Sequence, residues 1–304
     1  VKVAAKRGFV NLKGFVNGVL RTISRNREDI QLPDKTDMVA YLSIVYSLPE
    51  WLVKQWLAVY DADTVETMGK AFLENKKTTI RKSPKAGDTT EFVKRLETEG
   101  VIVEPETQMK DVFYISGYDY LEKLQTFRNG EFYVQDISSM QVAEWADPKA
   151  GDVIIDVCAA PGGKSIHLAE KLDGTGMVEA RDLTEYKVEL LQENIERSGL
   201  TNICARVQDA TVKDPESVGN ADIVIADLPC SGLGILGRKP DLRYKMTPKM
   251  QEELVKLQRE ILKVVCEYVK PGGKLLYSTC TIHKAENEDN TAWFQKEHPE
   301  FQLQ

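Results

Sequence analysis

The sequence is poor in the residues on which metal sites and disulfide frameworks depend. Its 304 residues include five cysteines and three histidines, and no two cysteines stand in a C-x-x-C spacing. An odd number of cysteines without that spacing argues against a disulfide framework and against a zinc site. The histidines, at positions 167, 283 and 298, are scattered and form no ligand cluster. We therefore predict reduced thiols, no bound metal, and histidines that lie at the surface or beside a site.

Long apolar runs are also missing. No run approaches the roughly 18 residues that a transmembrane helix needs, and no signal-peptide pattern opens the chain. Hydrophobic residues make up 42% of the sequence and charged residues 29%, which suits a globular protein with a sizeable core. The length predicts about two domains. Together with the reduced cysteines, these features predict a cytoplasmic protein without a membrane partner.

Acidic residues are absent from two stretches that are rich in Lys and Arg. The net charge of −7 disfavours a nucleic-acid partner, but residues 1–27 hold seven basic residues and no acidic one. There are two further basic groups. The first is free of acids and comprises Lys76, Lys77, Arg81, Lys82 and Lys85. The second surrounds Asp241 and comprises Arg238, Lys239, Arg243 and Lys245. Such patches can neutralise phosphates whatever the net charge. The alternative is a solvated charged face, the usual role of charge runs.

One strand–turn–helix unit organises the second half of the chain. Residues 153–157 are mostly β-branched, as in a buried parallel strand, and Pro161-Gly162-Gly163 ends the run before a helix that begins near Ser165. This order opens nucleotide-binding α/β domains, where the helix N-terminus offers free N–H groups to a ligand. The alternative is an ordinary tight connection between a strand and a helix.

The sequence of this turn does not match either of two well-known phosphate-binding loops. The G-x-G-x-x-G spacing of a nicotinamide-dependent dehydrogenase is absent. Gly163-Lys164-Ser165 matches the end of an ATPase P-loop, but Cys158 stands where that loop needs its first glycine. The missing glycine matters because a P-loop wraps its N–H groups around phosphate from its first turn. Both functions are therefore disfavoured.

From residue 150 onwards strands and helices alternate, which predicts an α/β fold with a mostly parallel sheet. The predicted strands are 153–157, 176–180, 203–207, 222–226 and 274–278; the predicted helices are 165–172, 185–198 and one that starts at Thr247-Pro248 and stops at Pro271-Gly272-Gly273. Upstream, a helix over 1–25 and a polar linker over 26–36 precede an α+β module. Its predicted helices are 38–47, 49–59, 64–74 and 89–99, and its strands 78–81, 101–103 and 112–115.

Polar residues follow the predicted strands where ligands of open α/β sheets bind. Asp182, Asp209, Asp227, Cys230 and Cys280 lie at or just beyond the carboxyl ends of four strands. One acid at such a place is most simply a helix N-cap, and this is our default for Asp209. Three acids and two cysteines on one edge indicate a site. An acid after the second strand can accept hydrogen bonds from a ribose diol.

Three segments at this edge resemble the signature motifs of the NOL1/NOP2/Sun family of S-adenosylmethionine-dependent RNA cytosine-C5 methyltransferases. They are Asp156-Val-Cys-Ala-Ala-Pro-Gly-Gly-Lys164, Asp227-Leu-Pro-Cys-Ser-Gly232 and Ser278-Thr-Cys280, and Phe132-Tyr-Val-Gln-Asp136 and Arg181-Asp182 with Glu193-Asn194 also fit. The resemblance covers about residues 130–300. It implies a Rossmann-like methyltransferase domain over 131–304 and, before it, a small α+β RNA-contacting subdomain over 37–130.

The first helix resembles a part of one branch of the family. Residues 13–21 are similar to the last helix of the NusB-like domain carried by the bacterial small-subunit ribosomal RNA enzyme. This implies that residues 1–28 are the end of a helical NusB-like domain and that 16S ribosomal RNA is the substrate. Gln304 stands where the family continues into a last antiparallel strand, so we expect that strand to be missing. We expect a monomer.

The resemblance implies a role for each residue of the edge. The methionine end of the cofactor would be lined by Cys158, Ala159, Ala160, Pro161, Gly162, Gly163 and Lys164. Asp182 would hold the ribose hydroxyls and Asp209 the adenine side. Asp227 would lie by the cofactor and meet the cytosine edge, with Lys164 nearby. Cys280 would be the nucleophile and Cys230 would assist product release; position alone does not rank the two cysteines. Leu228 departs from the small residue expected there.

The chemistry of cytosine methylation fits these residue types. A thiolate that adds to C6 makes C5 nucleophilic, which is covalent catalysis. Because a free thiol has a pKa of about 8.5, the site should lower the pKa of the attacking cysteine. A hydrogen-bond donor at N3, for which a protonated Asp227 could serve, would stabilise the charge in the ring. The rival function is an RNA-binding ribosome-assembly factor with an inactive methyltransferase fold, against which both cysteines and the three acids argue.

Overall fold

The computed structural model describes residues 1–29, 31–74 and 77–304. The chain forms two compact units, Val1–Leu73 and Glu74–Gln304. The division into domains at residues 28, 37 and 130 stays a prediction. Over the described residues, no helix is long and apolar enough to cross a membrane. In the same part of the chain, no three His, Cys, Asp or Glu side chains form a group that could hold a metal ion.

The first unit is helical. Its α-helices are α1 (Lys2–Lys6), α2 (Lys13–Arg25), α3 (Met38–Val45), α4 (Glu50–Leu57) and α5 (Ala62–Leu73). The prediction of one helix over 1–25 was wrong, because Gly8 takes a φ of 87° and a 3-10 turn over Val10–Leu12 separates α1 from α2. Helices α3 to α5 pack together through buried apolar residues that include Leu52, Trp56 and Val65.

The second unit begins with a small antiparallel sheet. Its strands are β1 (Thr78–Lys82), β2 (Ile102–Pro105), β3 (Val112–Ser116) and β4 (Phe132–Val134), in the order β2-β3-β1-β4. Helix α6 (Thr89–Thr98) turns Phe92 and Leu96 into a core that Ile80, Phe113 and Phe132 of the sheet complete. A short helix, α7 (Gln125–Arg128), precedes β4. Strand β4 was not predicted, because it has only three residues.

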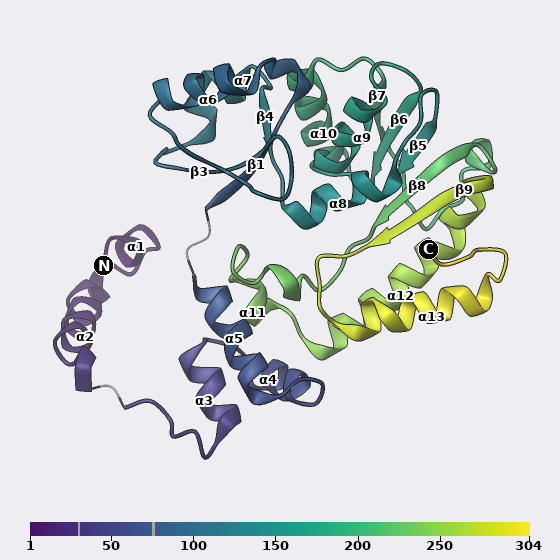
Figure 1. Cartoon of the computed structure of the whole chain (residues 1–304). Helices are drawn as coiled ribbons and strands as arrows, with labels where there is room; N and C mark the ends of the chain where they lie inside the picture. Colours follow the sequence, from purple (N-terminus) through teal and green to yellow (C-terminus); the bar gives the residue numbers. More distant parts are fainter. Residues whose placement is uncertain (30, 75–76) are drawn as a thin grey trace. The chain divides into compact units, whose positions relative to one another are not determined.

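A five-stranded parallel sheet forms the centre of the second unit (Figure 1). Its strands are β5 (Val153–Asp156), β6 (Met177–Asp182), β7 (Ile203–Val207), β8 (Ala221–Asp227) and β9 (Val269–Ser278), in the order β7-β6-β5-β8-β9. The predicted α/β, Rossmann-like fold is thereby confirmed. The chain builds outward from β5 to β7 and then returns to β8 on the other side of β5. The crevice between β5 and β8 is therefore the switch point at which such sheets bind ligands.

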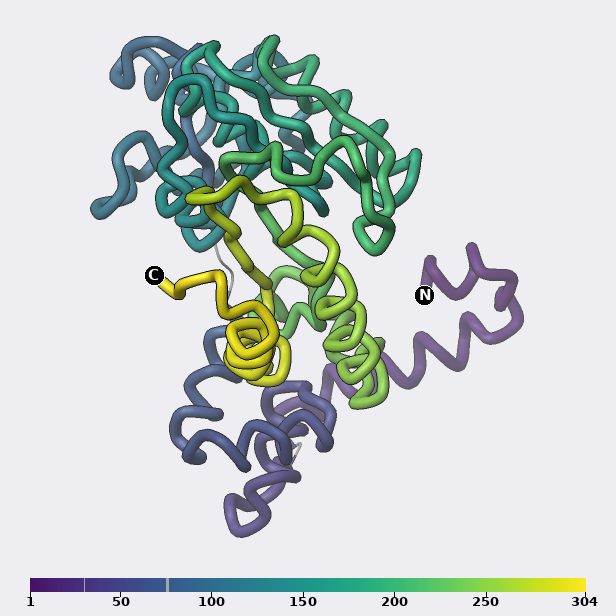
Figure 2. Tube along the Cα trace, turned by 90° about the vertical axis from the view of Figure 1, so that its right-hand side faces the viewer, coloured from purple at the N-terminus to yellow at the C-terminus, as the bar shows by residue number. Residues whose placement is uncertain are grey.

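Helices cover both faces of this sheet, which explains the nearly continuous apolar runs of its central strands β5 and β8. On one face, Ile154, Val178 and Ile223 pack against helices α8 (Ile137–Ala146), α9 (Gly163–Lys171) and α10 (Glu185–Ser198). On the other face, Ile155 and Val224 pack against α12 (Pro248–Val265) and α13 (Glu288–Glu297). Helices α12 and α13 lie side by side in both views (Figures 1 and 2). A short helix, α11 (Leu242–Lys245), precedes α12.

The predicted end of the last long helix was wrong. Helix α12 stops at Val265, and Pro271-Gly272-Gly273 lies inside β9. The register of β9 on β8 jumps there, from Ala221 opposite Val269 to Ile223 opposite Lys274. A proline that cannot donate to a ladder is tolerated because β9 is an edge strand and the segment bulges.

Candidate active site

The turn after β5 has the conformation that the glycines predict. Gly162 has a φ of 108°, a region that favours glycine, and a Cβ there would lie 3.1 Å from Leu191 Cδ2. The turn is held by hydrogen bonds from Gly162 N to Ala159 O (2.7 Å) and from Asn194 Nδ2 to Pro161 O (2.9 Å). Helix α9 then starts at Gly163, so its free N–H groups face the carboxyl edge of the sheet. This cradle of backbone N–H groups fits the carboxylate end of an amino-acid-like ligand.

Asp182 lies against this turn, and its predicted contact with a ribose stays a prediction. Its side chain is almost fully buried at the end of β6 and accepts hydrogen bonds from Ala160 N at 3.1 Å and Leu183 N at 2.8 Å. Lys187 Nζ lies 2.9 Å from Asp182 Oδ1. Asp209 follows β7 and accepts from both the N–H and the hydroxyl of Thr211, at 2.8 and 2.7 Å. It therefore caps a turn, and a contact between Asp209 and a ligand stays a prediction.

Lys164 and Asp227 meet across the switch point. Lys164 Nζ, in the first turn of α9, lies 2.6 Å from Asp227 Oδ2 at the end of β8. Ser278 Oγ donates to Asp227 Oδ1 at 2.8 Å. In this arrangement Lys164 is the hydrogen-bond donor and Asp227 is the acceptor. Since a lysine has three N–H donors, Lys164 keeps donors for a second partner, and the donor role suggested for a protonated Asp227 stays a prediction.

The two predicted cysteines are in contact. Cys230, in the loop after β8, has its Sγ 3.2 Å from Sγ of Cys280, which follows β9. The hydrogen bond from Cys230 lowers the pKa of Cys280. The same hydrogen bond and burial raise the pKa of Cys230, and they outweigh the opposing effect of the Cys280 N–H, 3.2 Å from Cys230 Sγ. The pair is therefore asymmetric, with the thiolate favoured on Cys280, the more exposed of the two.

Cys158, the first residue of the predicted cofactor turn, has no such activation. Burial raises the pKa of the Cys158 thiol to about 12, and the nearby carboxylates of Asp156 and Asp182 act in the same direction. The Cys158 side chain is therefore a neutral thiol that packs against the apolar core between the sheet and α12. Its proposed place beside a cofactor stays a prediction.

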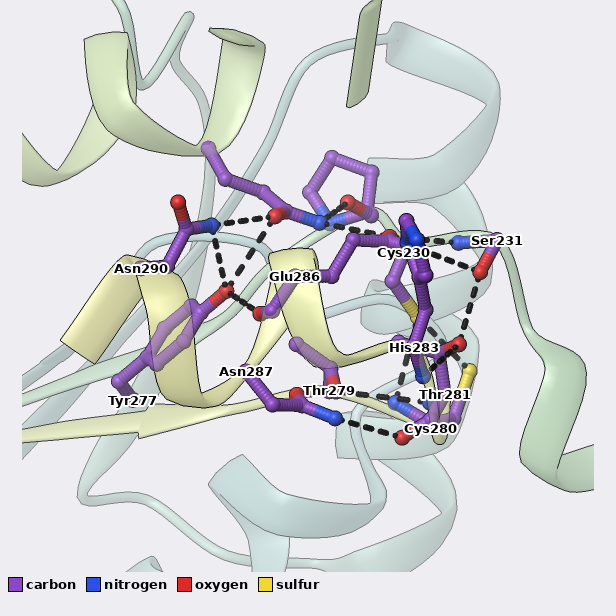
Figure 3. Close-up of polar contacts among 12 residues, drawn as sticks. Cys230, Ser231, Tyr277, Thr279, Cys280, Thr281, His283, Glu286, Asn287 and Asn290 are labelled. Atoms are coloured by element: carbon purple, nitrogen blue, oxygen red, sulfur yellow. Dashed lines mark hydrogen bonds and ion pairs between the residues drawn. The ribbon is translucent and has the colours of Figure 1, made fainter. Parts of the chain in front are cut away.

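Two buried carboxylates near this edge had no predicted role. Asp156 at the end of β5 accepts from Ser165 Oγ at 2.6 Å and so ties β5 to α9; burial raises the pKa of Asp156 to about 7. Glu286, between β9 and α13, is fully buried and has its Oε1 3.1 Å from His283 Nδ1 (Figure 3). The only sequence signal for Glu286 is an acid just before a helix, which is common for electrostatic reasons alone.

The predicted RNA surface needs a correction. Arg81 and Lys82 are buried: Arg81 forms an ion pair with Glu170 of α9, and Lys82 Nζ lies 3.2 Å from Asp111. These two cations hold the small sheet in place and are not available to phosphates. Lys76 lies outside the described residues. The basic residues of 1–27, by contrast, are all exposed.

Comparisons with known proteins agree with this fold. Residues 143–304, more than half of the chain, match the family model described as 16S rRNA methyltransferase RsmB/F. Over 99% of its length, the chain is 39% identical to "Probable ribosomal RNA small subunit methyltransferase B" of Bacillus subtilis, of which it covers 67%. It is 30% identical to "Ribosomal RNA small subunit methyltransferase B" of Serratia proteamaculans, of which it covers 68%.

A solved structure, that of PH0851, superposes with a TM-score of 0.83 at 32% identity and covers 90% of this chain and 62% of its own. The chain thus spans about two thirds of these relatives. The matched family is one of methyltransferases, in line with the predicted cofactor S-adenosylmethionine. The chain belongs to the 16S rRNA methyltransferase RsmB/F family.

Proposed function

We propose that the chain transfers a methyl group from S-adenosylmethionine to C5 of a cytosine in small-subunit ribosomal RNA, through a covalent bond between Cys280 and C6. The observation that carries this proposal is the asymmetric thiol pair, with sulfurs 3.2 Å apart, at the carboxyl edge of the sheet. Two thiols in contact suit a reaction in which one sulfur must attack and a second group must help it leave. The names of the relatives support ribosomal RNA as the substrate.

The cofactor half of the site would be the turn after β5 with Asp182 and Asp209. The free backbone N–H groups of the first turn of α9, at Gly163 and Lys164, would take the carboxylate of the cofactor, and Asp182 would accept from the ribose hydroxyls. Asp182 is suited to this role because Ala160 N and Lys187 already hold its carboxylate in place. When bound, S-adenosylmethionine supplies an electrophilic methyl group on a sulfonium.

In the catalytic half, the Cys280 thiolate would form a bond to C6 of the cytosine and push the electron pair of the C5–C6 double bond to C5. Lys164 would donate a hydrogen bond to the ring and stabilise the negative charge that develops there. Asp227 orients Lys164 through the 2.6 Å contact. C5, now nucleophilic, is the atom that is methylated.

Release would then require two bonds to break. The proton on C5 leaves to a base, its electron pair restores the C5–C6 double bond, and the Cys280–C6 bond breaks with its electrons returning to sulfur. Cys230 would assist this elimination, since its Sγ is in contact with that of Cys280. The target nucleotide must leave its stack to reach the cysteines, which favours single-stranded or loop RNA.

The experiment that tests the proposal is methyl transfer to small-subunit ribosomal RNA, followed by bisulfite sequencing. We expect one or more cytosines that resist conversion only when protein and S-adenosylmethionine are both present. The rival function, an assembly factor with an inactive fold, predicts RNA binding without a resistant cytosine. Methylation at another base or at an exocyclic nitrogen would contradict the C5 assignment.

A further inference from the structure

A buried carboxylate stands behind the two cysteines. Glu286 has no exposed surface, although it belongs to a short 3-10 turn between β9 and α13. Its Oε2 accepts from Ser231 N at 2.9 Å and from Gln258 Nε2 at 3.0 Å. Its Oε1 accepts from the Ser231 hydroxyl and lies 3.1 Å from His283 Nδ1 (Figure 3). Four donor positions from three segments of the chain thus converge on one side chain.

These contacts fix both neighbours of Cys230. Ser231, which follows Cys230, gives its N–H and its hydroxyl to Glu286. Pro229, which precedes Cys230, accepts at its carbonyl from Gln258 Nε2 at 2.9 Å. Gln258 is itself held in orientation, because its Oε1 accepts from Asn290 Nδ2 at 2.8 Å. Since consecutive Cα atoms are about 3.8 Å apart, fixing both neighbours fixes the Cys230 backbone.

The loop of Cys280 is joined to the same network. Thr281 Oγ1 lies 2.7 Å from Ser231 Oγ, and because the Ser231 hydroxyl donates to Glu286, Thr281 must donate to Ser231. On the other side of Cys280, Thr279 Oγ1 donates to Asn287 Oδ1 at 2.6 Å, and Asn287 Nδ2 donates to Thr281 O at 3.0 Å. One chain of hydrogen bonds therefore runs from Glu286 through Ser231 to the loop that carries Cys280.

A buried carboxylate is expensive unless donors fill its lone pairs. Here burial acts to raise the pKa of Glu286, but the hydrogen bonds from His283, Ser231 and Gln258 outweigh it, so the pKa is lowered and the group is a carboxylate. An apolar side chain of this size would stabilise a core more simply. The feature that distinguishes this position is that its hydrogen bonds link the two loops that carry the cysteines.

We propose that Glu286 is a positioning residue, which acts through Ser231 and Thr281 to hold the sulfurs of Cys230 and Cys280 in contact. The consequence for methyl transfer rests on the proposed function, but the spacing of the two sulfurs does not. If Glu286 is neutralised, the donors lose their common acceptor and the two loops separate. The sulfur atoms then meet less often, and both attack and release become slower.

Two variants loosen the link without a large change in volume. Glu286→Gln keeps an acceptor for Ser231 N but presents an NH₂ group to donors that need an oxygen. Thr281→Val removes the hydroxyl that reaches Ser231. The matched control is Asp214→Asn: Asp214 is also a buried carboxylate of this unit, but its partners Arg181, Arg206 and Ser217 lie outside the cysteine loops. Glu286→Ala leaves buried donors unpaired and is expected to lower stability, so it is not the deciding variant.

The first measurement is the rate at which diamide joins Cys230 to Cys280, followed by mass spectrometry of the disulfide-linked peptides. The azo bond of diamide takes up the two thiol hydrogens and is reduced to a hydrazide as the sulfur–sulfur bond forms. We expect Glu286→Gln and Thr281→Val to slow this closure roughly tenfold, the factor that corresponds to about one lost hydrogen bond. Asp214→Asn should close at the rate of the unchanged chain.

The second measurement is methyl transfer under saturating RNA, where kcat should fall by a similar factor while KM for S-adenosylmethionine is kept. Unchanged disulfide rates in both variants would overturn the inference, as would equal slowing in Asp214→Asn. If the variants slow disulfide closure but the unchanged chain methylates no cytosine, the positioning role stands and the proposed function fails. If cytosine is methylated and the variants retain full kcat, the positioning role fails and the proposed function stands.

Discussion

The two halves of the carboxyl edge are held in place by different means. In the half after β5 and β6, the turn at Gly162 is set mainly by a backbone conformation and a backbone hydrogen bond, with side-chain support from Asn194 and Asp182. In the half after β8 and β9, the cysteine loops are set by side chains, with Glu286 at their centre. A glycine substitution should therefore damage the first half, whereas loss of a single polar side chain should damage the second.

The largest expected effect is on methyl transfer, and it differs between variants of Cys280 and Cys230. Cys280→Ala should abolish methyl transfer, a loss on the order of 10⁴-fold or more, because nothing can add to C6. Cys230→Ala should still attack and transfer but stall before elimination. It should therefore accumulate a protein–RNA species that survives denaturing electrophoresis. Cys204→Ala, an exposed cysteine on β7, is the control and should behave as the unchanged chain.

Two outcomes would contradict this order of events. An adduct with Cys280→Ala and none with Cys230→Ala would exchange the roles of the two residues. Methyl transfer by both variants without any adduct would exclude covalent catalysis. A modest loss of stability is expected for Cys230→Ala in all cases, since it removes a half-buried side chain, and a smaller one for Cys280→Ala, since Cys280 is exposed.

The next effect tests the half that is held by backbone. Gly162→Ala should cost roughly 1–2 kcal/mol, because an L-residue is strained in the left-handed region, and the new Cβ would also press on Leu191. Binding of S-adenosylmethionine should weaken about tenfold as the turn shifts. Gly163→Ala is the matched control, since its Cβ would have nothing nearer than 3.9 Å. Calorimetry on both variants checks the prediction; equal affinities would show that the turn does not hold the cofactor.

The position of the candidate site on the sheet could be predicted from the sequence better than the contacts within the site could. The carboxyl ends of parallel strands meet at one edge whatever the details of packing, so the order of strands along the chain is enough to place Asp182, Asp227, Cys230 and Cys280 together. Strand β7 had its predicted bounds, because its apolar and β-branched residues stand between clear turns.

What the sequence could not predict depends on partners far apart in the chain. Arg81 was assigned to a basic surface, since a charge run does not reveal that Glu170, 89 residues later, will bury it. The role of Glu286 depends on donors from the β8 loop and from α12, which only the tertiary structure brings together. The broken first helix depends on the left-handed conformation of Gly8, which the apolar periodicity of residues 1–25 does not reveal.

A similar effect on cofactor affinity is expected at Asp182, which is held by backbone N–H groups and by the side chain of Lys187. Asp182→Asn keeps the shape but removes the charge that pairs with Lys187 at 2.9 Å. If Asp182 accepts from the ribose, affinity for S-adenosylmethionine should fall roughly tenfold, in keeping with the loss of a charge-assisted hydrogen bond. Lys187→Met serves as the control for the ion pair alone. Calorimetric affinities that fall equally in both variants would assign Asp182 to the support of Lys187 and not to the ribose.

The smallest expected effect concerns Asp209. Its substitution is also the sharpest test of the contrast between the two halves. Its Oδ1 caps the turn after β7 through Thr211, so Asp209→Ala should lower stability by about 1 kcal/mol whether or not a ligand touches it. Adenosine affinity, measured by calorimetry, separates the two roles. If Asp209 only caps the turn, adenosine binds the folded variant as it binds the unchanged chain. If it also contacts the adenine side, adenosine affinity falls several-fold.

Thr211→Val resolves the remaining ambiguity, because it removes the hydroxyl from the turn while the carboxylate of Asp209 stays. A loss of adenosine affinity in Asp209→Ala that Thr211→Val does not share assigns the carboxylate to the ligand. In that case a side chain, as well as the backbone, holds the cofactor half, and the contrast between the two halves is one of degree. An equal loss of adenosine affinity in both variants means instead that binding depends on the shape of the turn. The cofactor half is then the one that is held mainly by backbone.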